Sequence, residues 1–222
     1  MDHIVKIRSI KHVTHDVLQV VTEKPAGHTY IPGQANDVSV NKDGWRDEKR
    51  PFTFTSLPTD DHVEFTIKTY PAHNGVTNQL LQLAAGDELI LGEIFGDIAY
   101  KGEGMFIAGG AGVTPFIAIF RDLQSRNEIG NNKLVFANKT KADIIHDEEF
   151  TKLLGRNFIN VLSDEKIDGY EHGYITAEIL KKNISHPGQY FYLCGPPPMM
   201  DVVEKQLASL NIDKQKIIKE AF

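Results

Sequence analysis

Residues 50–56, RPFTFTS, bring a cation, an aromatic ring and a hydroxyl together in one short stretch. Arginine can pair with phosphate, an aromatic ring can line the wall of a flat ligand, and a hydroxyl can hydrogen-bond to the ligand's edge. Arg50, Phe52 and Thr53 supply one of each. The alternation of apolar and hydroxyl residues predicts a strand, and an edge strand that begins with proline and exposes its arginine would look similar. Two interpretations therefore stay open: a site for a flat, phosphorylated ligand, or a plain edge strand.

A second candidate site is the glycine-bearing turn in FIAGGAGVTPF. An apolar strand runs through three glycines into a predicted helix that opens with Thr114 and Pro115, which are favourable N-cap and N1 residues. A helix start offers unpaired N–H groups and a partial positive charge, which suit a diphosphate. Pro115 occupies the place of the last glycine in the G-x-G-x-x-G dinucleotide motif. A standard dinucleotide dehydrogenase is therefore disfavoured, and a purely structural turn remains the alternative.

A third candidate is the turn in YLCGPPPMM, where a predicted buried strand ends at Cys194 and Gly195. The prolines that follow cannot donate backbone hydrogen bonds and suit the start of a helix. Ligands of α/β sheets bind at the carboxyl edge, where this turn should lie. The alternative for Cys194 is a small buried apolar residue, the usual environment of a lone cysteine.

The elements that must position these residues differ between the two halves of the chain. Up to about residue 100, short β-type stretches separated by Gly, Pro, Asn and Asp predict an antiparallel barrel or sandwich. One short helix is predicted inside GVTNQLLQLAAGDE, with Thr77 as N-cap and Gly86 at its end. Further on, strands and helices alternate, which predicts a mostly parallel sheet covered by helices. We expect two domains, residues 1–100 and 101–222.

The composition narrows the function classes. The chain has 222 residues, 41% hydrophobic and 24% charged, and no apolar run of about 20 residues that could insert into a membrane. A net charge of −6 argues against nucleic acid or anionic membrane as the main partner. One cysteine excludes both an intrachain disulfide and a four-thiolate cluster, and nine scattered histidines without H-E-x-x-H spacing predict no metal site. The N-terminal stretch lacks the apolar core of a signal peptide, so we expect a cytoplasmic protein.

Five stretches together resemble one family: RPFTFTS, GVTNQL, IAGGAGVTP, FANKTKADI and YLCGPPPMM. Their order and approximate spacing resemble the ferredoxin–NADP reductase superfamily over essentially the whole chain. The nucleotide motifs look most like NADH-cytochrome b5 reductase and nitrate reductase flavoprotein domains, and the short length looks like bacterial flavodoxin reductases. The resemblance implies an N-terminal FAD-binding antiparallel β-barrel over residues 1–100 and a C-terminal NAD(P)-binding α/β domain over residues 101–222.

The resemblance also implies which residues hold the flavin. Arg50 would bind the diphosphate and Thr53 would lie beside flavin N5. Phe52 stands where the family usually has tyrosine, which keeps stacking possible but removes a hydroxyl to the ribityl chain. The expected flavin-binding residues are Arg50, Pro51, Phe52, Thr53, Ile67, Lys68, Tyr70, Gly75, Val76 and Thr77.

The same resemblance places the nicotinamide nucleotide. The expected contacts are Gly110, Gly112 and Thr114 near the diphosphate, Asn138 and Asp143 near the ribose, and Cys194, Gly195 and Pro196 near the nicotinamide. An acid such as Asp143 favours NADH because it accepts from a 2′-hydroxyl and repels a 2′-phosphate, whereas Lys139 would favour NADPH. We expect a slight preference for NADH. The ending KEAF resembles the family's terminal acid and covering aromatic, which makes Glu220 and Phe222 candidates for catalysis together with Thr53 and Cys194.

The expected reaction is transfer of a hydride from NADH or NADPH to FAD, followed by release of single electrons to an acceptor. The acceptor is left open between flavodoxin, ferredoxin, a cytochrome, an oxygenase and a small molecule, as is the oligomeric state. Two other functions stay open: a reductase that uses free flavin as a diffusing substrate, and a nucleotide-sensing or electron-relay subunit without catalysis of its own.

Overall fold

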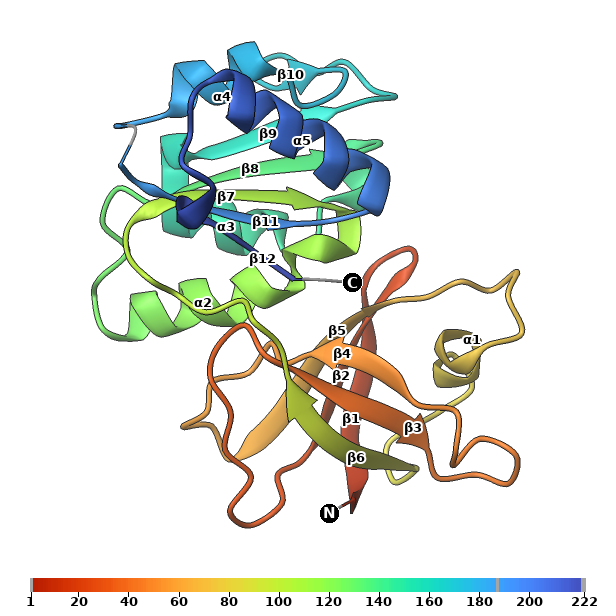
Figure 1. Ribbon diagram of the computed structural model, residues 1–222. Coiled ribbons are helices and arrows are strands. Elements are labelled where there is room, and N and C mark those ends of the chain that lie inside the picture. The colour runs from red at the N-terminus through yellow and green to blue at the C-terminus, as the bar shows by residue number, and fades with distance from the viewer. Residues whose placement is uncertain (1, 187, 221–222) are drawn as a thin grey trace. The chain divides into compact units, whose positions relative to one another are not determined.

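The computed structural model describes residues 2–186 and 188–220 (Figure 1). The chain forms two compact units: Met1–Gly96 with Thr114–Asp122, and Asp97–Val113 with Leu123–Phe222. Helix α2 (Thr114–Ser125) thus belongs mostly to the first unit by its contacts. The division between residues 100 and 101 stays a prediction. Among the described residues, no helix has both the length and the apolar character needed to cross a membrane.

The first unit is built on an antiparallel sheet of six strands in the order β4-β3-β6-β1-β2-β5. A single bridge joins Phe54, just beyond β4, to Phe65 of β5, so the two edge strands meet and the sheet curls into a barrel. This confirms the expected antiparallel β domain. The strands are β1 (His3–Thr14), β2 (Val17–Glu23), β3 (Ala35–Val40), β4 (Arg50–Thr53), β5 (His62–Lys68) and β6 (Glu88–Phe95).

Aromatic rings form the centre of the barrel core. Phe54 stacks between Tyr30, at a centroid distance of 3.9 Å, and Phe65, at 5.4 Å. Helix α1 (Val76–Leu80) buries its two terminal residues against this core. The helix begins after Gly75, so the prediction of Thr77 as N-cap is wrong by two positions. Gly75 has an extended backbone and its carbonyl accepts from the N–H groups of residues 78 and 79, which starts the helix earlier than a side-chain signal suggested.

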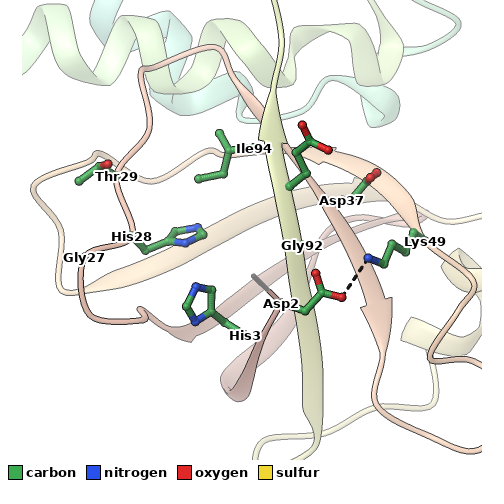
Figure 2. Close-up of a pocket in the computed structure, with 10 residues that line it drawn as sticks. Asp2, His3, Gly27, His28, Thr29, Asp37, Lys49, Gly92 and Ile94 are labelled. Atoms are coloured by element: carbon green, nitrogen blue, oxygen red, sulfur yellow. Dashed lines mark hydrogen bonds and ion pairs between the residues drawn. The ribbon is translucent and has the colours of Figure 1, made fainter.

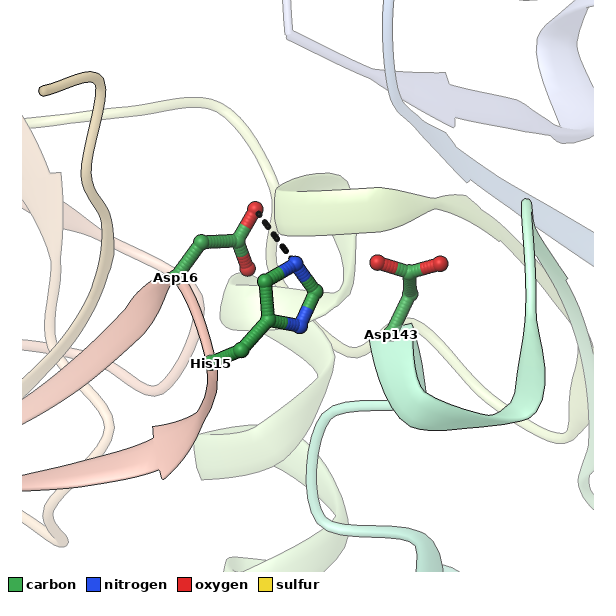
Figure 3. Close-up of side chains that lie close together, drawn as sticks. All are labelled: His15, Asp16 and Asp143. Atoms are coloured by element: carbon green, nitrogen blue, oxygen red, sulfur yellow. Dashed lines mark ion pairs between the residues drawn. The ribbon is translucent and has the colours of Figure 1, made fainter.

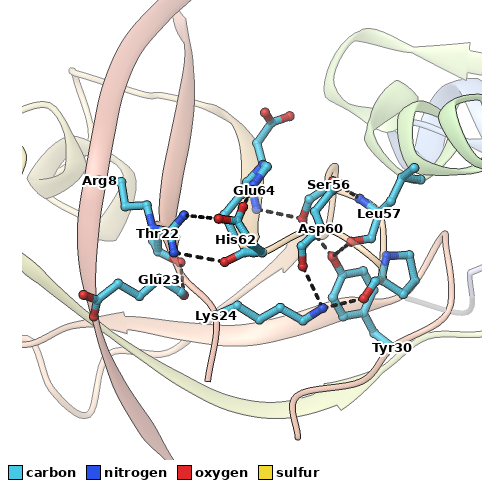
Figure 4. A network of polar contacts seen from close by, with 12 residues as sticks. Arg8, Thr22, Glu23, Lys24, Tyr30, Ser56, Leu57, Asp60, His62 and Glu64 are labelled. Atoms are coloured by element: carbon cyan, nitrogen blue, oxygen red, sulfur yellow. Dashed lines mark hydrogen bonds and ion pairs between the residues drawn. The ribbon is translucent and has the colours of Figure 1, made fainter. Parts of the chain in front are cut away.

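A polar network crosses one end of the barrel (Figure 4). The Tyr30 hydroxyl lies 2.8 Å from the Ser56 hydroxyl, which accepts from the Glu64 N–H, also at 2.8 Å. Lys24 donates to the Asp60 carbonyl at 3.0 Å. Burial raises the pKa of Tyr30 to about 12, so its hydroxyl keeps its proton and remains a donor. The network supplies partners to polar groups that would otherwise be buried alone.

The Glu64 carboxylate is buried inside the first unit. It accepts from Thr55 Oγ1 at 2.8 Å and from Gln19 Nε2 at 2.7 Å, and it pairs with Arg121 of α2 at 2.7 Å. Each of its oxygens thus has a charged or polar donor, as a buried carboxylate requires. Arg121 also donates to the Thr55 carbonyl at 2.7 Å, which fastens this part of α2 to the strands of the barrel.

The second unit is a parallel sheet of six strands in the order β10-β9-β8-β7-β11-β12. Alternate residues of the strands form one core with α4 and α5, while Phe150 of α3 packs near Phe158 on the other face. The predicted alternation of strands and helices is confirmed. The elements are β7 (Gly104–Gly109), β8 (Lys133–Asn138), α3 (Asp147–Leu154), β9 (Phe158–Leu162), β10 (Glu171–His172), α4 (Ala177–Asn183), β11 (Tyr190–Cys194), α5 (Pro197–Ser209) and β12 (Ile217–Lys219).

Candidate functional site

Two turns meet at the carboxyl edge of the parallel sheet. Strands β7 and β11 are neighbours, and Ala108 pairs with Cys194 at their ends. The chain leaves β7 through a 3₁₀ turn, η1 (Gly110–Val113), and leaves β11 through Gly195. The two glycine-bearing turns found in the sequence are therefore side by side at the edge where α/β sheets bind ligands.

The glycines of these turns serve two different purposes. A Cβ on Gly112 would overlap the carbonyl of Cys194, and a Cβ on Gly109 would overlap the Met199 sulfur. Gly112 must lack a side chain for the two turns to pack together, because its neighbour is backbone, whereas the flexible Met199 side chain beside Gly109 could shift. Gly110 differs: its φ is +51° and a Cβ there would meet nothing within 4 Å. Of the three, Gly110 is the one whose backbone faces open space and could be approached by a ligand.

The helices after the two turns begin differently from each other. Helical backbone starts at Gly110 with η1, and the buried Thr114 is the first residue of α2 rather than its N-cap. Helix α2 therefore opens at Thr114 and Pro115 as expected, and the N-cap role predicted for Thr114 is wrong by one position. Helix α5 starts as predicted, with Pro196 as N-cap and prolines in its first turn. The Pro196 carbonyl accepts from the N–H groups of Met199 at 2.9 Å and Met200 at 3.1 Å.

Two titratable groups of the second unit interact electrostatically: Cys194, which is buried, and Glu220, which is half-buried. Burial raises the pKa of Cys194 to about 12, and the negative charge of Glu220 adds to the shift. The Glu220 carboxylate accepts from the Asp97 N–H at 3.2 Å. Burial raises the pKa of Glu220 and the charge of Asp97 contributes, while that backbone hydrogen bond acts in the opposite direction. The thiol is thus neutral at physiological pH, and Glu220 is more easily protonated than an exposed glutamate. Phe222 lies outside the described residues.

The ribose candidates follow β8. The Asn138 amide nitrogen is buried and finds no hydrogen-bond partner in the described part of the chain, which suits a donor waiting for a ligand acceptor. Asp143 lies in η2 (Lys141–Asp143), where its carboxylate accepts from the Thr140 N–H at 2.8 Å and hydroxyl at 2.7 Å. This capping box fixes the acid that the sequence assigned to the ribose. Lys139 is exposed.

The flavin candidates of the first unit lie mostly at its surface. The Arg50 side chain is 48% exposed and its guanidinium donates to the Lys49 carbonyl at 2.7 Å, with Glu48 at 3.4 Å. Pro51 is exposed beside it. Phe52 is half-buried and packs against Phe65, at a centroid distance of 6.4 Å. A held but solvent-facing guanidinium next to a half-buried ring fits a diphosphate attached to a flat ring system.

The end of β5 supplies three further candidates. Ile67 is buried in the barrel core, so a ligand would meet its backbone rather than its side chain. Lys68 pairs with Asp16 at 2.6 Å. Tyr70 is 46% exposed and stacks on His73, with ring centroids 5.7 Å apart and planes 16° from parallel. An exposed, pre-oriented aromatic ring suits contact with a flat ligand.

The start of α1 completes the flavin set. Gly75 is the N-cap, no side chain caps the helix, and a Cβ on Gly75 would meet nothing within 4 Å. The first N–H groups of α1, from Val76 and Thr77, therefore face a position where no side chain competes for them. Strand β4 lies against β5, and α1 lies against β3, so the barrel brings these candidates onto neighbouring elements. The donors and rings present fit FAD.

A separate hollow of about 660 Å³ opens on the barrel (Figure 2). Asp2 and Lys49 face each other in it at 3.0 Å. His28, which is buried, stands edge-on to His3 with ring centroids 5.9 Å apart. None of the residues assigned to the flavin or the nicotinamide lines this hollow, and its acids make it unlike a phosphate site. Its lining residues are Asp2, His3, Gly27, His28, Thr29, Asp37, Lys49, Gly92, Glu93 and Ile94.

Comparison with known proteins agrees with this geometry. The FAD-binding domain family matches residues 3–99, and the oxidoreductase NAD-binding domain family matches residues 106–205. NADH-cytochrome b5 reductase 1 of Eremothecium gossypii is 31% identical, over 85% of this chain and 71% of its own length. The chain belongs to the ferredoxin–NADP reductase superfamily. It therefore carries an FAD-binding domain followed by a nicotinamide-nucleotide-binding domain, as the sequence resemblance implied.

Other relatives are similar over most of this chain. NADH-cytochrome b5 reductase 2 of Mycosarcoma maydis and the propane 2-monooxygenase reductase component of Rhodococcus jostii are each 31% identical, over 89% and 98% of this chain. The chain spans 62% of the length of each. The flavohaem-like FAD/NAD-binding domain of nitric oxide dioxygenase from Vibrio cholerae has the same fold, with a TM-score of 0.87 and 24% identity over 99% of this chain and 98% of its own.

Proposed function

We propose that this chain is an NADH-dependent flavoprotein reductase that delivers electrons to an acceptor protein. The observation that carries the proposal is the packing of the open Gly110 turn beside the Cys194–Gly195 turn, at the carboxyl edge of a sheet in an NAD-binding domain. Bound FAD supplies the chemistry, because it takes two electrons as a hydride from NADH and can release them one at a time. The residues of the chain bind and orient the two nucleotides.

In the first unit, the proposal assigns phosphate binding to Arg50 and to the first N–H groups of α1. The guanidinium is half exposed, with Glu48 at 3.4 Å as its side-chain partner, and the helix start has no side-chain cap. Phe52 and Tyr70 offer apolar rings for the flat part of the ligand. Thr53, the half-buried last residue of β4, offers a hydroxyl for the edge of the ligand. With Pro51, Ile67, Lys68 and Gly75 these residues make up the proposed FAD site.

In the second unit, the proposal assigns the NADH diphosphate to the Gly110 turn, which Gly112 shapes. Thr114, the first residue of α2, follows this turn directly in the chain and is proposed as a further diphosphate contact. Cys194, Gly195 and Pro196 would lie against the nicotinamide. The neutral thiol of Cys194 acts there as a small apolar surface rather than as a nucleophile, because burial keeps its proton in place. Glu220, whose pKa is raised, can hold a proton beside this site.

A preference for NADH over NADPH is supported by Asp143. The Thr140 hydroxyl and N–H fix this carboxylate at the end of β8, where it would repel a 2′-phosphate. The Asn138 amide, which has no partner in the described part of the chain, can donate to a ribose hydroxyl. Two of the similar proteins named above are NADH-cytochrome b5 reductases, which is consistent with this preference.

The proposed acceptor is a one-electron carrier protein. The names of the relatives point to cytochrome b5 and to oxygenase components as acceptor classes, while flavodoxin, ferredoxin and small acceptors could accept electrons by the same chemistry. The acceptor class can be tested by following the reduction of each purified carrier in the presence of NADH and a catalytic amount of the chain.

The reductase proposal is tested by rapid mixing of the purified, yellow protein with NADH and, separately, with NADPH. We expect the flavin absorbance to bleach with both, and faster with NADH. A colourless protein that reduces added flavin would instead indicate a free-flavin reductase. A yellow protein that bleaches but supports no turnover with any acceptor would indicate a relay subunit. No bleaching with either nucleotide would overturn the proposal.

A further inference from the structure

The turn between β1 and β2 makes an unusual set of contacts with the end of β5. The Asp16 carboxylate lies 2.6 Å from the Lys68 ammonium and accepts from the Thr14 hydroxyl at 3.1 Å. The Asp16 carbonyl accepts twice from Thr69, from its N–H at 2.7 Å and from its hydroxyl at 2.9 Å. Figure 3 shows the His15 ring beside the same carboxylate, with Nε2 at 3.7 Å. Asp16 thus fixes the backbone at Thr69 and pairs with the charge of Lys68, in the segment that leads to Tyr70.

Segment 67–70 belongs to the proposed FAD site, so what holds it bears on the flavin. We propose that Asp16 is a positioning residue for the flavin: it fixes the end of β5 and neutralises the charge of Lys68 beside the bound ring. This inference rests on the proposed function. Asp16 stood outside every motif in the sequence, because the two residues of the pair are far apart in the chain and meet only through the pairing of Val17 with Lys68 across β2 and β5.

The Asp16–Lys68 pair is partly shielded from water, so the loss of either charge should be felt by nearby groups. The side chains are 21% and 27% exposed. Burial acts to raise the pKa of Asp16, but the hydrogen bond and charge of Lys68 and the hydrogen bond from Thr14 bring it below its usual value. Asp16 is therefore ionised at neutral pH and compensates the lysine. Charges in such a setting are screened less than charges on an open surface.

The charge balance predicts a definite effect on the flavin. A hydride brings one net negative charge into the flavin site, so an uncompensated cation nearby favours the reduced flavin and an uncompensated anion favours the oxidised flavin. With both Asp16 and Lys68 present, the two effects largely cancel. Removing either partner should shift the midpoint potential of the bound flavin, and the two removals should shift it in opposite directions.

Asparagine is a suitable replacement for Asp16. It has nearly the same shape and can still accept from Thr14, and the two hydrogen bonds to Thr69 come from the main-chain carbonyl, which the substitution does not alter. Asp16→Asn thus removes the charge and leaves the anchoring of the backbone. Lys68→Met removes the opposite charge and keeps most of the aliphatic stem. The double variant removes both charges.

The experiment is a spectroelectrochemical titration of the flavin in the purified holoproteins at one fixed pH. We expect Asp16→Asn to raise, and Lys68→Met to lower, the ratio of reduced to oxidised flavin at a given potential by about three- to tenfold, which is about 14 to 30 mV for a two-electron couple. The double variant should return toward the parent, and Asp16→Glu, which restores the charge, should match it.

Asp61→Asn is the matched control, because Asp61 also forms an ion pair in the first unit, with Arg8 at 3.2 Å, but its side chain is 84% exposed. Its potential should equal that of the parent. Shifts in the same direction for Asp16→Asn and Lys68→Met, or no shift in either, would overturn the inference. If one single variant proves unstable, the double variant is compared with the other single variant. A double variant whose flavin potential differs from that of the parent as much as the single variant's does would also overturn the inference. A parent protein that binds no flavin would instead overturn the proposed function itself.

Discussion

The two candidate sites differ in what they offer a ligand. The flavin site of the first unit relies on side chains, whereas the nicotinamide site of the second unit relies on glycines. In the first unit the candidates present side chains: Arg50 and Tyr70 are nearly half exposed and Lys68 is held by an ion pair. In the second unit the decisive feature is missing side chains, since Gly109 and Gly112 leave room for Met199 and for the Cys194 carbonyl. The difference shows that one site should be weakened by deleting atoms and the other by adding them.

The largest expected effect concerns the reactivity of the buried thiol in the second unit. Because burial raises the pKa of Cys194 to about 12, its thiolate fraction at pH 8.5 is far below that of a free cysteine. We expect alkylation of Cys194 by iodoacetamide to be more than about 100-fold slower in the folded protein than in the urea-unfolded protein at this pH. Mass spectrometry of timed samples measures both rates. Equal rates would show that the turn is open to solvent.

The next effect compares a methyl group added to each unit. Gly112→Ala should lower the free energy of unfolding by about 3 kcal/mol, because the new Cβ meets a backbone carbonyl that cannot move aside. Gly75→Ala is the matched variant in the first unit, where a Cβ meets nothing within 4 Å and φ is −132°. It should cost about 1 kcal/mol or less. Urea unfolding of both variants decides the comparison, and equal costs would contradict it.

Deleting a side chain in the first unit should weaken ligand binding without weakening the fold. We expect Arg50→Ala to bind FAD about 10- to 100-fold more weakly, the loss typical of a charge-assisted hydrogen bond to phosphate. Its unfolding free energy in the absence of flavin should change by less than about 0.5 kcal/mol, because the guanidinium is half exposed. Arg8→Ala, which removes another exposed arginine of the barrel, is the control. Retention of flavin by Arg50→Ala at the parent's affinity would exclude Arg50 from the site.

The smallest effect is a pH dependence of stability that arises in the first unit. Burial lowers the pKa of His28, and the charges of His3 and Lys24 contribute. Below about pH 6.5 the unfolded chain therefore binds a proton that folded His28 resists, so stability is lost as the pH falls. Between pH 7.5 and 5.5 the parent should lose about 1 kcal/mol more than His28→Gln in urea unfolding. The control is His73→Gln, which replaces an exposed ring and should show the same change in unfolding free energy with pH as the parent. If His28→Gln shows that same change, the prediction is refuted.

The sequence was sufficient for the features that depend on local patterns. The change from period-two strands to alternating strands and helices predicted the antiparallel and parallel sheets, and the prolines after Gly195 predicted the start of α5. The residue types predicted the wrong helix cap where no side chain caps the helix. The N-cap of α1 is Gly75 instead of Thr77, and a 3₁₀ turn, η1, precedes Thr114, the first residue of α2.

Contacts between residues far apart in the chain could not be predicted from the sequence patterns. The overlap that forbids a side chain on Gly112 comes from Cys194, and the partner of Lys68 comes from a turn between two other strands. The hollow beside His28 left no signal because its lining comes from several strands and loops. Phe222 and the proposed roles of the site residues stay predictions from the resemblance.

The buried thiol has one more consequence, for durability. Peroxide attacks a cysteine through its thiolate, and the oxidised sulfur that results can pass irreversibly to higher acids. An electron-transfer protein in air works close to such oxidants. Because Cys194 is buried and its pKa is raised to about 12, the one cysteine of this chain carries little thiolate and should resist oxidation by peroxide.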